Sequence, residues 1–106
     1  KQVDIVGHAW FFHRDLLGAF WRDNDRPLNM ICGEDVHFSY SIQKHLGLNT
    51  YVPPHPSDDL DLWGSQPTEA MKYGVDNNAI SVNSDGIEFG LSLTNYYNKG
   101  FKLLNV

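Results

Sequence analysis

The chain has 106 residues, with 8 Lys and Arg against 13 Asp and Glu, and a formal charge of −5. This length allows one small domain, and 42% hydrophobic residues with 13% aromatics are enough to form a core. The acidic balance, with no cluster of Lys and Arg, excludes nucleic acid and anionic membrane surfaces as default partners. The longest apolar run, Ala9–Phe12, is shorter than the roughly 18 residues of a membrane span. The sequence therefore predicts a soluble segment and favours the cytoplasm as its compartment.

The first third of the chain is predicted to form a strand followed by a helix. β-Branched residues predict a strand over Val3–Val6, and the small residues around His8 interrupt it. Apolar residues at helical spacing then predict a helix over residues 13–22. Asp23–Pro27 has the side chains of a turn, because Asn and Asp bond their own backbone and Pro ends a preceding helix.

A second helix and a second strand follow. Apolar side chains every four residues predict a helix over residues 34–46, and Gly47 stands where a left-handed residue commonly ends a helix. Residues 48–52 are a strand candidate, which the prolines of Pro53–Pro56 end in a stiff, extended loop. This order of strands and helices indicates an α/β layer architecture.

The last part of the chain has weaker patterns. We expect a helical turn or two over 69–73, a helix over about 89–98 that stops at Gly100, and a closing strand over 101–106. Residues 1–106 form a single domain in this interpretation. The early strand suggests a piece of a longer protein, which would self-associate through an exposed sheet edge. A clean monomer in light scattering at micromolar concentration would count against that self-association.

Acids and imidazoles gather between residues 34 and 55. Glu34 and Asp35 have a structural interpretation as helix-capping acids, and a functional one as rigidly held carboxylates, of which one serves as general base. His37 and His45 lack the one-turn spacing of a helical metal site and are interpreted as surface or hydrogen-bonded core histidines. His55 differs, because the prolyl loop holds an exposed imidazole that suits a divalent metal.

The other reactive or aromatic side chains are interpreted mainly as structural. We expect the three tryptophans to lie in the core, and the alternative is that they form a stacking surface for a sugar ring. They are Trp10, Trp21 and Trp63. Cys32 lies beside two acids and has no obvious cause for a lowered pKa, so it is a poor nucleophile candidate. Asp59-Leu60-Asp61 is interpreted as solvated surface.

Three blocks in order carry a family resemblance. They are Val3–Arg14, Gly33–Phe38 and Tyr51–Pro56, and together they resemble the C-terminal, acceptor-side half of GT-A fold nucleotide-sugar glycosyltransferases. In that family a strand with a small-residue break and a helix precede a Glu-Asp element that opens another helix, and a strand then leads to a metal-proximal His. The fold implied is a partial GT-A-like α/β layered fold, and the chain is then a fragment of a larger catalytic domain.

The resemblance implies roles for particular residues. Asp35 would be the general base that deprotonates the acceptor hydroxyl in an inverting transfer, and Glu34 would hold the acceptor by hydrogen bonds. His55 would complete a site for Mn²⁺ or Mg²⁺. The remaining acceptor-side positions would be Gly7, His8, Ala9 and Trp10.

The partners implied are a nucleotide-sugar donor and a glycan or other hydroxyl acceptor. The family's Asp-x-Asp motif does not occur upstream, and the nucleotide-binding half is missing, so the isolated 106 residues are expected to be inactive. Two other classes stay open. One is a non-catalytic carbohydrate-binding or interaction module, which needs no metal. The other is a small metallohydrolase, which needs Asp35, His37 and His55 to converge on one ion.

Overall fold

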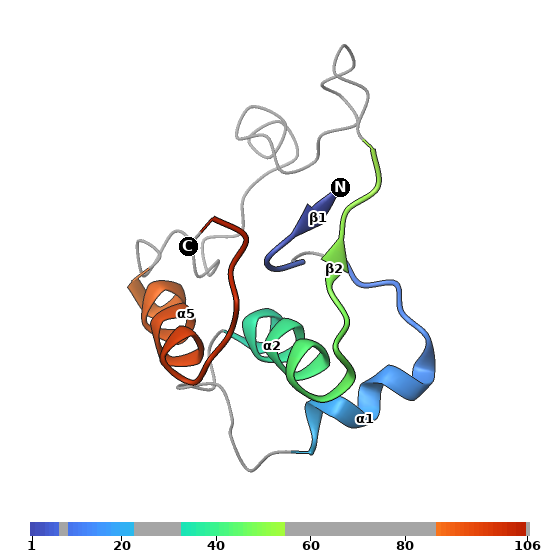
Figure 1. Cartoon of the computed structure of the whole chain (residues 1–106), viewed down its shortest axis with the longest axis horizontal. Helices are drawn as coiled ribbons and strands as arrows, with labels where there is room; N and C mark the ends of the chain where they lie inside the picture. Colours follow the sequence, from blue (N-terminus) through green and yellow to red (C-terminus); the bar gives the residue numbers. More distant parts are fainter. Residues whose placement is uncertain (7–8, 23–32, 55–86, 106) are drawn as a thin grey trace, which may run out of the picture.

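The computed structural model describes residues 1–6, 9–22, 33–54 and 87–105, which form a small mixed α/β unit (Figure 1). The elements in chain order are strand β1 (Gln2–Val3), 3-10 helix η1 (Arg14–Leu16), helix α1 (Leu17–Phe20), helix α2 (Glu34–Leu46), strand β2 (Thr50–Tyr51) and helix α5 (Ile87–Asn98). The α/β class predicted from the sequence is therefore confirmed for the described residues. Predictions for residues 7–8, 23–32, 55–86 and 106, including the turn at 23–27 and the helical turns at 69–73, lie outside them.

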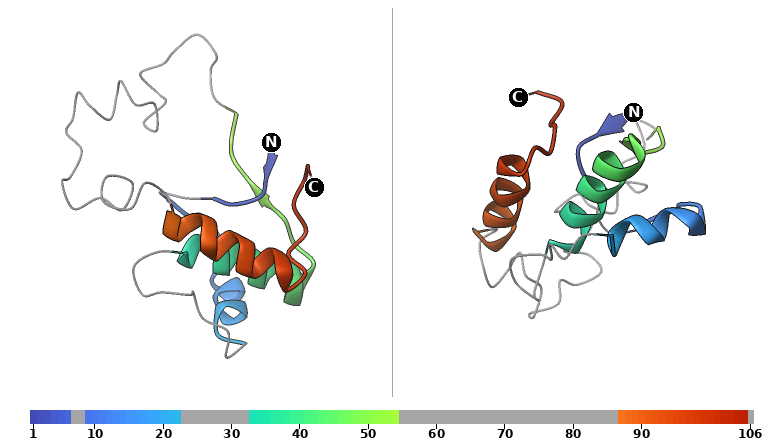
Figure 2. Two further views of the ribbon diagram at one scale, coloured as in Figure 1. Left: turned by 90° about the vertical axis from the view of Figure 1, so that its left-hand side faces the viewer. Right: turned by 60° about the horizontal axis from the view of Figure 1, so that its bottom comes forward.

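Helix α2 lies at the centre of the described unit. Figure 2 shows α1 and α5 on opposite sides of it. Every residue from Val36 to Ile42 is buried, so this helix is covered almost all round over two turns. The apolar residues of this buried run belong to two hydrophobic clusters. One contains Val36, Tyr40, Tyr96 and Phe101, and the other contains Ala19, Phe38 and Ile42.

The ends of α2 are set by glycines with positive φ. Gly33, with φ 100°, precedes the helix, and Gly47, with φ 63°, follows it. The amide of Gly47 donates to the carbonyl of Gln43 at 3.1 Å, and the amide of Leu48 donates to that of Ile42 at 3.3 Å. A residue after Leu46 must adopt a left-handed conformation to make these bonds, which favours glycine. The predicted bounds of this helix, and Gly47 as its end, are confirmed.

The two strands form a short antiparallel sheet with Gln2 opposite Tyr51 and Val3 opposite Thr50. Both strands are shorter than predicted. On β2, Leu48 is held by the bond to the end of α2, so the strand cannot begin there. On β1, the pairing ends at Val3, and Oδ1 of the next residue, Asp4, accepts a hydrogen bond from the amide of Leu104 at 2.7 Å.

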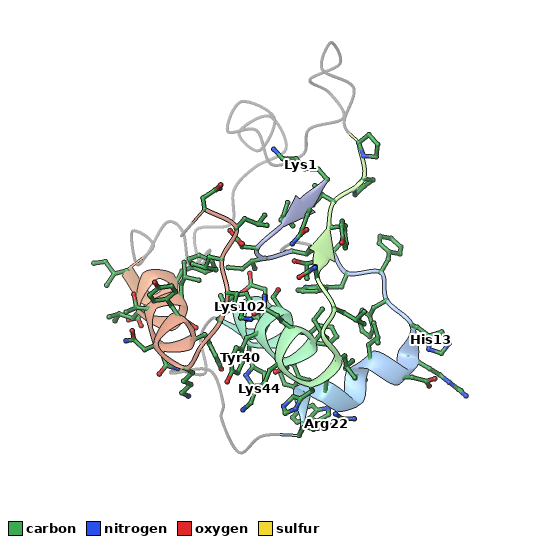
Figure 3. The ribbon with its side chains drawn as sticks, in the orientation of Figure 1. Lys1, His13, Arg22, Tyr40, Lys44 and Lys102 are labelled. Atoms are coloured by element: carbon green, nitrogen blue, oxygen red, sulfur yellow. The ribbon has the colours of Figure 1, made fainter. Side chains whose placement is uncertain are left out.

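The prediction of a closing strand at the C-terminus is wrong for residues 101–105, which form no strand. Their backbone is instead bound by side chains. The amide of Lys102 donates to Oε1 of Gln43 at 2.8 Å, and Nε2 of Gln43 donates back to the carbonyl of Lys102 at 3.0 Å. Figure 3 shows Lys102 beside α2, where these two bonds hold it. The segment after α5 is therefore fixed to α2 without joining the sheet.

The helical segment after residue 12 is also shorter than predicted. The side chain of His13 accepts from the amide of Asp15 at 3.3 Å and starts η1, and α1 ends at Phe20. Trp21 follows the helix and is 63% exposed, so the prediction that it belongs to the core is wrong. Trp21 lies one turn after Leu17, which is also exposed, so the two residues share an exposed side of this segment.

Candidate functional site

The candidate site is built on the first turn of α2, which carries Glu34 and Asp35. Glu34 is exposed and Asp35 is half-buried. Oδ1 of Asp35 accepts a hydrogen bond from the amide of Val36 at 2.8 Å. This amide belongs to the first turn, whose N–H groups have no partner within the helix, and carboxylates are favourable there because of the helix dipole. The structural role predicted for these acids is therefore present, and it orients the Asp35 carboxylate.

Hydrogen bonds hold the backbone of α2 on both sides of Asp35. The amide of His37 donates to the carbonyl of Gly33 at 2.8 Å, and the hydroxyl of Ser39 donates to the carbonyl of Asp35 at 2.8 Å. Burial is continuous from Val36 to Ile42. A carboxylate at the surface end of such a helix moves little relative to the core, which is what a general base requires.

Aromatic side chains from the segment before η1 lie beside the same helix. The ring of Trp10 lies 4.9 Å from that of Phe38, and the ring of Phe12 contacts Phe38 edge-on, also at 4.9 Å. Phe38 lies one turn after Glu34 and Asp35, and residues three and four apart share one side of a helix. The structure therefore brings half-buried Trp10 to the side of α2 that carries both acids. Of the other predicted acceptor-side residues, Ala9 is exposed, and Gly7 and His8 lie outside the described residues.

His37 is 1% exposed, and both of its ring nitrogens are engaged. Nε2 lies 2.8 Å from the carbonyl oxygen of Phe20, and Nδ1 lies 2.6 Å from the hydroxyl of Tyr96. Of the two interpretations of His37, a surface histidine or a hydrogen-bonded core histidine, the second is the one found in the structure. A metallohydrolase site containing His37 is not supported, because a metal ion would have to displace one of these buried hydrogen bonds.

Tyr96 is the residue in this region that the sequence did not reveal. It lies on α5, 59 residues from His37, and no local pattern connects the two. The helical spacing of α5 does not single out Tyr96, because Phe89, Leu93 and Tyr97 repeat every four residues and favour Tyr97 as the buried aromatic residue. In the structure Tyr97 is 46% exposed and Tyr96 is buried.

Metal ligands do not gather within the described part of the chain. Among residues 1–6, 9–22, 33–54 and 87–105, no three side chains of His, Cys, Asp or Glu come close enough to hold a metal ion. His55, the predicted metal ligand, lies outside these ranges. The chain runs on from β2 through Val52 to Pro53 and Pro54, which are exposed and directly precede His55 in the sequence.

A shallow polar crevice lies away from the acids, between the sheet, the later turns of α2 and the C-terminal segment. Its volume is about 10 Å³, with room for about one water molecule. It is lined by Gln2, Val3, Asp4, Ser39, Gln43, Leu48, Asn49, Thr50, Phe101 and Lys102. A sugar ring does not fit such a volume, so the crevice is not a substrate site.

Comparison of the chain with models of known protein families, with curated proteins and with solved structures gives no match. The family resemblance therefore depends on the three sequence blocks alone. Of the described helices, none has the length and apolar character required to cross a membrane.

Proposed function

We propose that this chain is the acceptor-side part of a nucleotide-sugar glycosyltransferase of the GT-A fold, with Asp35 as general base. The single observation that best supports the proposal is the first turn of α2. There a fixed, half-buried carboxylate lies one turn before Phe38, against which Trp10 packs at 4.9 Å. A carboxylate and an indole on one side of a helix suit a sugar acceptor, because the base can take the proton of a hydroxyl while the apolar face of the sugar ring packs on the aromatic side chain.

The proposed reaction is a single displacement. A carboxylate oxygen of Asp35 takes the proton of an acceptor hydroxyl, and the acceptor oxygen forms a bond to the anomeric carbon of the donor sugar. The bond from that carbon to the diphosphate oxygen breaks, and the nucleoside diphosphate leaves with the electron pair. Attack on the face opposite the leaving group inverts the configuration at the anomeric carbon. Glu34, exposed on the same helical turn, holds the acceptor through its other hydroxyls.

The proposal also includes Mn²⁺ or Mg²⁺ with His55 as a ligand, because the sequence resemblance implies it. The described residues do not assemble a metal site. We therefore route no step of the reaction through a metal.

The test measures hydrolysis and transfer of nucleotide sugars by the longest natural polypeptide that contains this chain, with and without Mn²⁺. The variant Asp35→Asn is informative because its Oδ1 still accepts from the amide of Val36, so the helix start is retained. We expect it to lose about 100-fold or more in kcat, the usual range for a general base. Asp15→Asn is the matched control, because Asp15 is an exposed acid on η1, outside the site.

Two results would contradict the proposal in different ways. Unchanged turnover in Asp35→Asn would remove the role of Asp35 as base. Absence of turnover with every donor tested would instead favour a carbohydrate-binding module. The observation that favours this second candidate is the exposure of three aromatic side chains, Phe11 at 98%, Trp21 at 63% and Tyr51 at 61%. Calorimetric binding of glycans without metal or nucleotide, lost in Trp21→Ala, would support it.

A further inference from the structure

We infer that His37, through its hydrogen bonds to Tyr96 and to the backbone of Phe20, is a positioning residue for the carboxylates of Glu34 and Asp35. The inference rests on the proposed function. It assigns a role in that function to a buried cluster that touches no substrate.

The cluster connects three helices at one point. His37 belongs to α2, Phe20 is the last residue of α1, and Tyr96 belongs to α5. The side chains of His37 and Tyr96 are almost completely buried, and their rings lie 5.5 Å apart. The ring of Phe20 also contacts that of His37 edge-on at 4.5 Å. Neighbours on both sides therefore hold α2 at the turn that carries the acids.

The partners define the proton positions of a neutral His37 ring. A carbonyl oxygen can only accept, so Nε2 carries the proton that bonds Phe20. Nδ1 is then the acceptor for the hydroxyl of Tyr96. The hydroxyl of Ser41 donates to the carbonyl of His37 at 2.7 Å. Donor and acceptor are thus matched at both ring nitrogens, which favours one orientation of the ring and of the helix turn.

The rotation of α2 about its axis determines where Asp35 points. A carboxylate projects roughly 5–6 Å from the axis of a helix, so a rotation of about 20° moves it by about 2 Å. A misplacement of about 1 Å at a reacting group can cost about 100-fold in rate. Loss of the Tyr96 hydroxyl therefore reduces catalysis although Tyr96 lies on another helix and does not contact the acceptor.

The test uses Tyr96→Phe in the longest natural polypeptide that contains this chain, with Tyr97→Phe as the matched control. Tyr97 is the next residue of the same helix and is exposed. We expect Tyr96→Phe to remain folded by circular dichroism and to lower kcat about 10- to 100-fold. Its KM for the donor should stay within about twofold of wild type, because the cluster makes no substrate contact. Tyr97→Phe should match wild type.

A second pair of variants separates positioning from packing. Asn in place of His37 can still accept from Tyr96, whereas Leu cannot, so His37→Asn should retain more kcat than His37→Leu. Amide hydrogen exchange at residues 37 and 38 should be faster in Tyr96→Phe than in Tyr97→Phe.

The outcomes distinguish this inference from the proposed function. Wild-type turnover that is lost in Asp35→Asn but unchanged in Tyr96→Phe would overturn the positioning role and leave the transferase intact. Equal kcat in Tyr96→Phe and wild type with a raised KM would also overturn it. A wild-type protein without turnover would overturn both.

Discussion

The hydroxyl of Tyr96 and Nδ1 of His37 lie 2.6 Å apart in the core, although 59 residues separate them in the sequence. This contact joins α5 to the central helix at the turn that carries the candidate acids. The other nitrogen of the same ring lies 2.8 Å from the carbonyl of Phe20, so one imidazole connects three helices. A buried polar group of this kind is costly once a partner is removed, which gives the contact a measurable effect on stability.

Tyr96→Phe should lower the free energy of unfolding by about 1–3 kcal/mol, because Nδ1 of His37 loses its buried donor. Urea denaturation followed by circular dichroism measures this loss. The exposed neighbour provides the control, and Tyr97→Phe should change stability by no more than about 0.5 kcal/mol. Equal stability of the two variants would show that the hydroxyl of Tyr96 contributes nothing in the folded state.

Phe38→Ala should destabilise the chain by about 3–5 kcal/mol, the usual cost of removing a buried phenylalanine ring. Phe38 contacts the rings of Trp10, Phe12 and Phe20, so its loss leaves a cavity and frees Trp10. Chemical denaturation gives the stability, and a red shift of tryptophan fluorescence would report the greater exposure of Trp10. Phe11 is 98% exposed. Phe11→Ala is therefore the control, and a loss as large as that of Phe38→Ala would contradict this assignment of the core.

Local signals explain why α2 was predicted with its observed bounds. The acids at its start, the apolar residues every four positions and Gly47 at its end all act within one helix or at its ends. The C-terminal segment was predicted wrongly because its backbone partners are distant side chains. Gln43 lies 59 residues from Lys102, and Asp4 lies 100 residues from Leu104. No periodicity within residues 101–105 carries that information.

In the candidate site, too, features with a local sequence signal were predicted and long-range contacts were not. The sequence indicated Glu34 and Asp35 as acids at the start of a helix, and the structure confirms that location. For Trp10, the sequence favoured a place in the core, and the family resemblance implied a contact with the acceptor. In the structure, Trp10 is half-buried and packs against Phe38. The contact between His37 and Tyr96 could not be predicted, because hydrogen-bond pairing between helices depends on how the helices pack in three dimensions.

Gly47→Ala should destabilise the chain by about 1 kcal/mol, because an alanine is strained at the φ of 63° that ends α2. Nothing lies within 4 Å of a Cβ built at this position, so the cost comes from the backbone alone. Gly90 lies within α5 and provides a control for which the opposite sign is expected. Its Cβ would also meet nothing within 4 Å, but its helical backbone suits alanine. Gly90→Ala should stabilise by about 0.5–1 kcal/mol. Thermal unfolding of both variants tests the pair, and a shift of the same sign in both would refute the assigned conformations.

Gln43→Ala should release the segment that follows α5, because the side chain of Gln43 both accepts from and donates to the backbone of Lys102. We expect a loss of about 1–2 kcal/mol for the two bonds together, since solvent can replace them in part. Amide hydrogen exchange at residues 101–104 should accelerate, and the exchange of α2 should change less. Gln43→Glu separates the two bonds, because a carboxylate still accepts from the amide of Lys102 but cannot donate to its carbonyl. Its exchange rate should therefore lie between wild type and Gln43→Ala. Exchange as slow as wild type in both variants would show that the burial of Phe101 and the hydrogen bond from Leu104 to Asp4 hold this segment without Gln43.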